Sequence, residues 1–359
     1  MDWGGQMKVG SPLGLKRDPH ADDSWVIDNK YHLPHPDDPS KELIAGRASE
    51  LGKTIANTFT LNKYHRRMVA EGMVINGSLR LEGAVARAQD RDEKRRRFNA
   101  IADKAQAAAS AKEPASKGTH LHEMFQLYDA RKVALADVPE PWDLDVIAYD
   151  ALLRKLGIVM VPELSEQIIW VRELNVAGKF DRLVKYLRLG SQWIVLDLKS
   201  GFDLSPGWHE IAVQELVYGS ANMIFDPETE TWSPAPSICA DRGLVLHIPS
   251  DHDREPRHIA TMYEVDLSQT IDLPQTVTPA QLAVAIQEWR KRKVSRVLAR
   301  VEVTEAGEII DRPLTWAERI QAAMSDGDLD LVEAECRDAG EWHGGLTTRK
   351  RNRSEYLAS

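Results

Sequence analysis

The sequence predicts a mixed α+β fold, in which a helical N-terminal region precedes a central mixed sheet flanked by helices. Residues 41–116 are rich in Ala, Arg, Glu and Leu and contain few β-branched runs, which favours helices. Residues 166–199 contain three segments rich in Val, Ile and Leu, which is typical of strands. Helical and strand patterns follow in turn, so the order of elements is that of an α+β protein.

The composition is typical of a soluble globular protein, with 43% hydrophobic and 28% charged residues. No run approaches the roughly 20 apolar residues that span a bilayer, and the first residues lack a signal-peptide pattern, so we expect no membrane partner. Cys239 and Cys336 are far apart and have no CxxC companion, which argues against a disulfide framework, a zinc knuckle and a four-cysteine iron–sulfur cluster. We therefore expect a cytoplasmic protein.

The N-terminal half is predicted to be helical after an irregular start. Residues 1–40 are rich in Pro, Asp, His and Gly and are expected to form an irregular arm. The helical region 41–116 ends in small residues and Pro114. Further helices are expected from Gly118 to about Ala130 and from Trp142 to Leu156, where apolar residues recur on one side.

The central part of the chain is predicted to alternate strands with a helix. A helix is expected at about 206–223, and the strands are expected at 166–174, 176–187, 192–199, 243–248 and 260–267. Residues 117–275 would form the core, and residues 276–359 would form a C-terminal helical region with a basic tail.

Two late helices begin at capping boxes, in which a threonine is followed three residues later by Gln or Glu. Thr278 and Gln281 open a helix that is expected to extend to about Arg300. Thr315 and Glu318 open one more helix.

Three charged residues gather on the predicted hairpin within residues 176–199. Asp197 and Lys199 point to the same face because side chains alternate along a strand. A tight turn around Leu189, Gly190 and Ser191 would place Asp181 roughly opposite the stretch from Asp197 to Lys199. Burying two carboxylates and an ammonium is costly unless something pairs them, and a divalent metal is the usual partner. The sequence therefore predicts a metal site on this hairpin.

Five short motifs follow one another in order between residues 117 and 220. They are Gly118-Thr119-x-x-His122, Glu166, Gly178-x-x-Asp181-Arg182, Asp197-x-Lys199-Ser200-Gly201 and Gln214-x-x-x-Tyr218. Together they resemble the RecB-like branch of the PD-(D/E)XK nuclease superfamily, as carried by phage exonucleases. The resemblance covers under a third of the chain, and it implies a restriction-endonuclease-like core over residues 117–275. Some members add four cysteines for an iron–sulfur cluster, which this chain lacks.

The resemblance implies a metal-dependent DNA nuclease, above all an exonuclease, that acts on the ends of linear DNA. It further implies a role in DNA recombination, repair or phage replication inside a bacterium or a phage-infected host. Phosphodiester hydrolysis needs an activated water and stabilisation of negative charge, and Mg²⁺ or Mn²⁺ supplies both.

The roles of individual residues also follow from the resemblance. Asp181, Asp197, His122 and the main-chain carbonyl of Leu198 would bind the metal. Lys199 would act on the attacking water, and Glu166 would complete the catalytic set. The residues expected to contact the substrate or to support the site are Gln214, Tyr218, Arg182 and Ser200.

Simpler interpretations exist for each motif. Asp197 and Lys199 could form a surface ion pair, Asp181 could cap a turn, and Glu166 could face solvent. For the function, a catalytically silent DNA-binding or assembly module on the same fold, a structure-selective endonuclease and an RNA-directed nuclease stay open as alternatives.

Three basic runs stand out against a net charge of −9, at residues 94–97, 290–293 and 349–353. Each is either a solvated face or a set of phosphate contacts. Trp289, next to the second run, either contacts a nucleic-acid backbone or packs. Residues 46–54 resemble a P-loop but have five residues between the glycines instead of four and no predicted strand before them, so we expect no ATP site.

Overall fold

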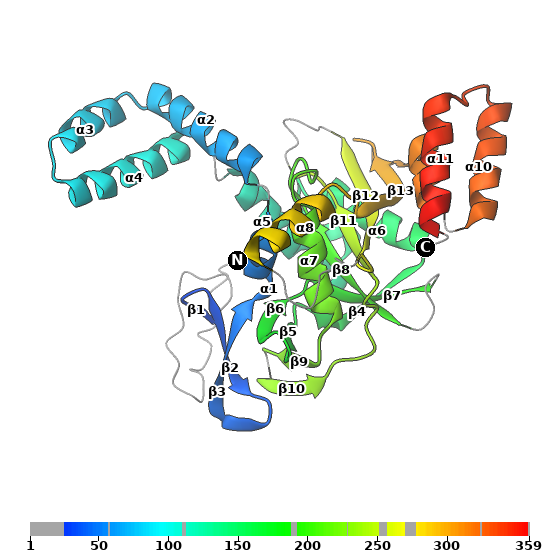
Figure 1. Ribbon diagram of the computed structural model, residues 1–359, viewed down its shortest axis with the longest axis horizontal. Coiled ribbons are helices and arrows are strands. Elements are labelled where there is room, and N and C mark those ends of the chain that lie inside the picture. The colour runs from blue at the N-terminus through cyan, green and yellow to red at the C-terminus, as the bar shows by residue number, and fades with distance from the viewer. Residues whose placement is uncertain are drawn as a thin grey trace.

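Two mixed sheets form the core of the protein, which confirms the predicted mixed α+β class (Figure 1). The computed structural model describes residues 25–56, 58–109, 113–187, 192–227, 229–250, 257–269, 278–323 and 325–357. The first sheet contains, in spatial order, β1 (Val26–Ile27), β2 (Lys30–His35), β3 (Asp38–Arg47), β6 (Val176–Lys179), β5 (Ile168–Val171), β9 (Met223–Asp226) and β10 (Thr231–Pro234). The second contains β14 (Ile309–Asp311), β13 (Ser295–Val303), β12 (His258–Asp266), β11 (Arg242–His247), β8 (Trp193–Lys199), β7 (Arg182–Tyr186) and β4 (Ile158–Ser165).

Helices surround these sheets. In the described residues they are α1 (Ala48–Lys53), α2 (Phe59–Ile75), α3 (Ser78–Arg87), α4 (Arg91–Ala108), α5 (Glu113–Asp129), α6 (Asp143–Leu156), α7 (Trp208–Gly219), α8 (Pro279–Trp289), α9 (Trp316–Ala322), α10 (Asp326–Asp338) and α11 (Gly344–Leu357). The α2–α4 unit projects from the core, and α10 and α11 lie at the opposite end (Figure 1). None of the described helices combines the length and apolar character that crossing a membrane requires.

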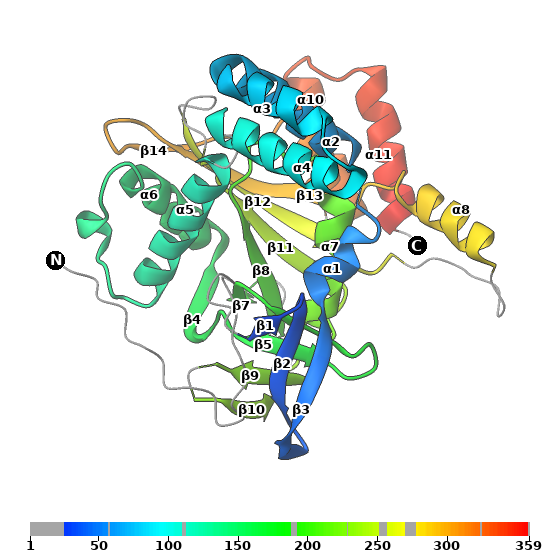
Figure 2. The same cartoon turned by 90° about the vertical axis from the view of Figure 1, so that its left-hand side faces the viewer.

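The second sheet is covered on both faces, and this decides where the charged residues of β8 lie. Leu196 and Leu198 belong to the main apolar cluster with residues of α5 and α6. The opposite face of the sheet meets α7, where Ile211 packs with Val245 of β11. Asp197 pairs in parallel register with Val245, so it shares the face that α7 covers. Figure 2 shows α5 and α6 on one side of β8 and β11, with α7 on the other.

The N-terminal predictions need correction in part. Residues 25–40 are not an irregular arm, and residues 41–47 are not helical, because β1, β2 and β3 occupy this segment. Buried Leu33, Leu43 and Ala45 alternate with more exposed neighbours, and this alternation outweighs the Pro- and Asp-rich composition. The strand β3 also directly precedes α1, so the statement that no strand precedes the P-loop-like segment was wrong, whereas its glycine spacing still differs from the motif. Residues 1–24 lie outside the described part of the chain.

The later elements differ from prediction at three points. The segment 176–187 is two strands in different sheets, and β4, β9, β10 and β14 were not predicted. The helix that begins at Thr278 has the expected capping box but ends at Trp289, and residues 295–303 form β13. This strand is buried along most of its length between β12 and β14, and its valines suit a pleated surface. The helices expected at 142–156 and from Thr315 are confirmed as α6 and α9.

Candidate active site

The chain passes from one sheet to the other at Phe180 and Asp181. Strand β6 ends at Lys179 in the first sheet, and β7 begins at Arg182 in the second. Phe180 is fully buried, and the main-chain carbonyl of Asp181 accepts a hydrogen bond from the N–H of Glu166 at 3.0 Å. Asp181 is therefore fixed by the backbone at the place where the two sheets meet.

The register of β7 and β8 agrees with the prediction that Asp181 lies opposite the stretch from Asp197 to Lys199, and it sets Asp181 level with Asp197. Arg182 lies opposite Leu196, so the next step of the antiparallel register brings Asp181 to the level of Asp197. Oδ2 of Asp181 accepts a hydrogen bond from the main-chain N–H of Leu198 at 2.6 Å. The Asp181 carboxylate thus lies against β8 between Asp197 and Lys199. The predicted turn at residues 189–191 lies outside the described residues.

Asp197 and Lys199 form an ion pair in which the aspartate is buried and the lysine is partly exposed. The Asp197 side chain is 5% exposed and that of Lys199 is 27% exposed. Burial raises the pKa of Asp197 to about 6, with Lys199 opposing this shift and Asp181 adding to it. Burial disfavours the charged form of Lys199 and by itself lowers the pKa of the amine. The carboxylates of Asp197 and Asp181 together have a larger opposite effect, so the pKa of Lys199 is raised. Lys199 therefore stays a cation near neutral pH.

Helix α5 brings His122 to the same group of charges. Burial lowers the pKa of His122, and the Asp181 carboxylate opposes that shift, while the positive charge of Lys199 adds to it. The neutral imidazole that results is the form that binds metals. Gly118 explains how the helix comes so close: a Cβ at this position would lie 2.4 Å from Oγ of Ser200, just after β8.

The sequence interpretation missed Glu215, a residue of α7 that faces the same charges. Its side chain is almost completely buried, and within the described part of the chain neither carboxylate oxygen has a hydrogen-bond partner. Burial, followed by the negative charge of Asp197, raises its pKa well above the usual value. Space for this carboxylate comes from Gly243 of β11, where a Cβ would lie 1.5 Å from Oε2 of Glu215. No short sequence motif identifies Glu215 as a site residue, because a Glu in a helix usually faces water.

Glu166, Gln214 and Tyr218 lie around Lys179, at the end of β6. Glu166 pairs with the Lys179 ammonium at 3.0 Å. Tyr218, which is 3% exposed, donates to the main-chain carbonyl of Lys179 at 2.9 Å, and Gln214 Nε2 donates to the Tyr218 hydroxyl at 2.6 Å. Tyr218 and Gln214 thus connect α7 to the end of β6, which leads into Asp181.

Arg182 and Ser200, the other two residues expected to contact the substrate or support the site, lie in the protein's own contacts. Arg182 is 1% exposed and its Nε donates to Asp129 of α5 at 2.6 Å, while Asp129 also accepts a hydrogen bond from Tyr149 of α6 at 2.9 Å. The main-chain carbonyl of Ser200 accepts from the N–H of Ser250 at 3.0 Å. Arg182 therefore orders the helices around the site from inside the core.

Two of the other predicted nucleic-acid contacts have local partners. On α4, Arg96 and Arg97 both pair with Glu93, at 3.0 and 2.6 Å. Trp289 is 9% exposed and packs edge-on against His209, with 4.8 Å between ring centroids. The structure thus supports packing for Trp289 and a balanced helix face for the first basic run.

The donor set fits a hard divalent cation. The unpartnered Glu215 oxygens and the carboxylates of Asp181 and Asp197 are the ligand type that Mg²⁺ and Mn²⁺ prefer. In the described residues, however, no group of three or more His, Cys, Asp or Glu side chains converges closely enough to hold an ion. A scan against protein-family models and a search of the curated proteins found no match to this chain.

Proposed function

We propose that this protein is a metal-dependent DNA nuclease, with exonuclease activity on linear DNA as its main reaction. One observation supports the proposal most: Asp181, in the link between β6 and β7, lies beside Asp197 and Lys199 of β8 at the place where the two sheets meet. If Asp197 and Lys199 formed only a surface ion pair, nothing would explain the Asp181 carboxylate beside them. Nor would such a pair explain why Glu215 is buried with no hydrogen-bond partner in the described residues.

The acidic residues would bind the metal ion, and the lysine would act on the phosphate and the attacking water. Asp181, Asp197 and the Leu198 carbonyl would hold a Mg²⁺ or Mn²⁺ ion, with His122 as a further ligand and Glu166 at the edge of the site. The ion would polarise the scissile phosphate and activate water. The pKa of Lys199 is raised in the metal-free protein, and its Nζ would stabilise negative charge that develops on the phosphate and would orient or help to deprotonate the attacking water.

Incubation of end-labelled linear DNA with the protein and Mn²⁺ tests the proposal. We expect the wild type to shorten the DNA, and both Asp197→Ala and Lys199→Ala to abolish cleavage. Asp311→Asn, which removes an exposed carboxylate on the far edge strand β14, is the control and should cleave normally. Near-normal turnover by Lys199→Ala would refute the role of the amine.

The same assay separates the alternatives. A wild-type protein that binds DNA and never cuts it would favour a catalytically silent binding or assembly module. Cleavage of circular single-stranded DNA would favour an endonuclease, and preferential competition by RNA would favour an RNA-directed enzyme.

Metal binding is measured separately by calorimetry with Mn²⁺. We expect Lys199→Ala to retain binding, because the lysine acts on water and phosphate. We expect His122→Ala to weaken it, and unchanged Mn²⁺ affinity in that variant would remove His122 from the ligand set.

A further inference from the structure

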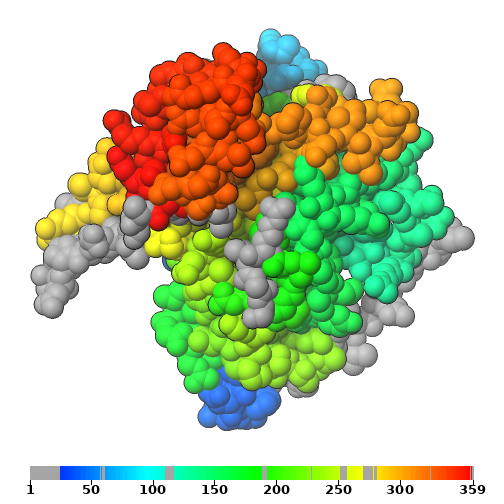
Figure 3. Space-filling view, turned by 90° about the vertical axis from the view of Figure 1, so that its right-hand side faces the viewer, coloured from blue at the N-terminus to red at the C-terminus, as the bar shows by residue number. Residues whose placement is uncertain are grey.

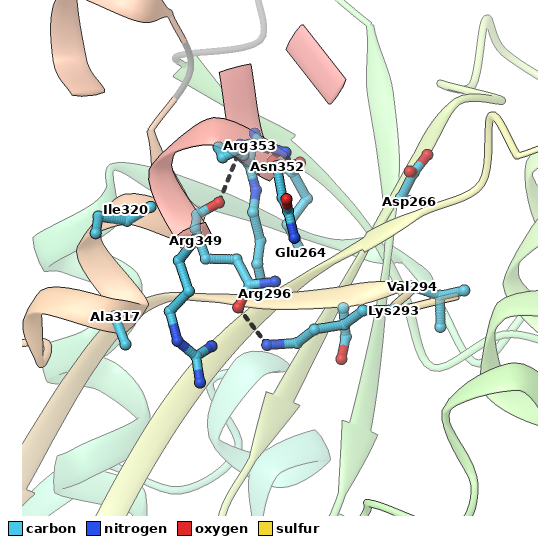
Figure 4. A pocket seen from close by; sticks show the side chains of 12 residues that line it. Glu264, Asp266, Lys293, Val294, Arg296, Ala317, Ile320, Arg349, Asn352 and Arg353 are labelled. Atoms are coloured by element: carbon cyan, nitrogen blue, oxygen red, sulfur yellow. Dashed lines mark hydrogen bonds and ion pairs between the residues drawn. The ribbon is translucent and has the colours of Figure 1, made fainter. Parts of the chain in front are cut away.

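A cavity of about 310 Å³ lies between the edge of the second sheet and the C-terminal helices (Figure 4). Strands β12 and β13 form one wall, and α9 and α11 form the other. In Figure 3 the C-terminal helices α10 and α11, in orange-red and red, form a protruding lobe. Four of the lining residues are cations and two are carboxylates, so the cavity has an excess of two positive charges.

Two of the cations have a structural role. Arg296 pairs with Glu264 at 2.6 Å and donates to the main-chain carbonyl of Ala323 at 3.2 Å. Arg353 donates to the same carbonyl at 2.7 Å. Both arginines therefore satisfy carbonyls at the end of α9, which is where cations stabilise a helix.

The other two cations, Lys293 and Arg349, come from two basic runs that are far apart in the sequence. Their side chains extend into the same space in Figure 4. Lys293 bonds to the side-chain oxygen of Gln321, with no carboxylate as its partner in the described residues. The side chain of Arg349 makes no hydrogen bond or ion pair within the described part of the chain.

The two charges repel each other. Burial, followed by the positive charge of Arg349, lowers the pKa of Lys293, and the Glu318 carboxylate opposes this shift. Two cations side by side are unfavourable, and an anion bound between them lowers that cost.

We propose that Lys293 and Arg349 bind the phosphate group of a nucleotide or of a nucleic-acid strand. The guanidinium of Arg349 offers a planar fork that suits phosphate oxygens, and the ammonium of Lys293 adds a point charge beside it. The cavity volume is at the lower end for small-ligand sites, so there is room for a phosphate with part of the group it carries. The site is separate from the Asp197 cluster and does not depend on cleavage of DNA.

The test measures binding of the full-length chain to a labelled 5′-phosphorylated single-stranded oligonucleotide, by fluorescence anisotropy in buffer with a chelator. We expect Lys293→Gln and Arg349→Gln each to weaken binding by about tenfold or more, because each removes a charge-assisted contact. The matched control is Arg351→Gln, on the same helix, whose side chain is exposed beside Glu355 at 3.9 Å and does not line the cavity. It should bind within about twofold of the wild type.

Competition identifies the source of the phosphate. Displacement of the probe by a deoxynucleoside 5′-monophosphate would assign the site to a small phosphoester, and displacement by oligonucleotide alone would assign it to a strand. Equal binding by the wild type and both cavity variants, or no binding of the probe by the wild type, would overturn the proposal. Because Lys293 and Arg349 are exposed, the unfolding midpoint of each variant should match the wild type, which separates lost binding from lost folding.

Discussion

Replacing Glu215 by Gln should make the metal-free protein more stable, and the gain should increase with pH. The native protein keeps this buried carboxyl protonated at pH values where the unfolded chain has already released the proton. The contribution of Glu215 to stability is therefore fully present below its ordinary pKa of 4.5 and is lost as pH rises toward its raised value. Gln has a similar shape and no proton to release, so the variant does not carry this cost.

The size of the effect follows from the linkage between protonation and folding. Within that window, the free energy of unfolding of the wild type falls by about 1.4 kcal/mol per pH unit because of this one group. The stability difference between Glu215→Gln and the wild type should grow at that rate.

Urea unfolding in the presence of a chelator, at about pH 5 and about pH 6, measures the difference directly. We expect the stability difference to rise between the two conditions, by at most about 1.4 kcal/mol. Glu210→Gln removes a partly exposed carboxyl from the same helix and controls for the loss of charge from α7. A difference that stays constant with pH would show that the carboxyl is not buried as described and would refute the reasoning.

Three further substitutions test the surroundings of the site. Arg182→Met leaves the buried Asp129 carboxylate without its cationic partner and should lower the free energy of unfolding by about 3–5 kcal/mol. Adding Asp129→Asn should recover part of this loss in chemical denaturation. Gly118→Ala places a methyl group against Ser200 Oγ and should lower the free energy of unfolding by about 1–3 kcal/mol. The loss of stability should be smaller when Ser200 is also replaced by Ala. An equal loss with and without Ser200→Ala would exclude this contact as the cause. Thr315→Ala removes the cap of α9 and should lower stability by about 1 kcal/mol, so an unchanged unfolding midpoint would contradict the capping box.

The geometry of the β7–β8 hairpin could be predicted because it depends on local counting. Side chains alternate along a strand, and the position of a turn sets which residues of its two strands face each other. The placement of Asp181 opposite Asp197 follows from these two rules, and the structure agrees with it. The capping boxes at Thr278 and Thr315 were predictable for the same reason, since each depends on residues three apart.

The features that the sequence concealed depend on contacts between distant segments. In the sequence, residues 295–303 resemble the continuation of a helix. In the structure they form a strand, because β12 and β14 pair with them on both sides. Glu215 likewise resembles an ordinary helix glutamate, and what buries it is a glycine in a strand that comes later in the chain. A side chain at Gly243 would exclude the carboxylate from the sheet, so the third acidic group of the site exists only because two positions, each uninformative alone, meet in the fold.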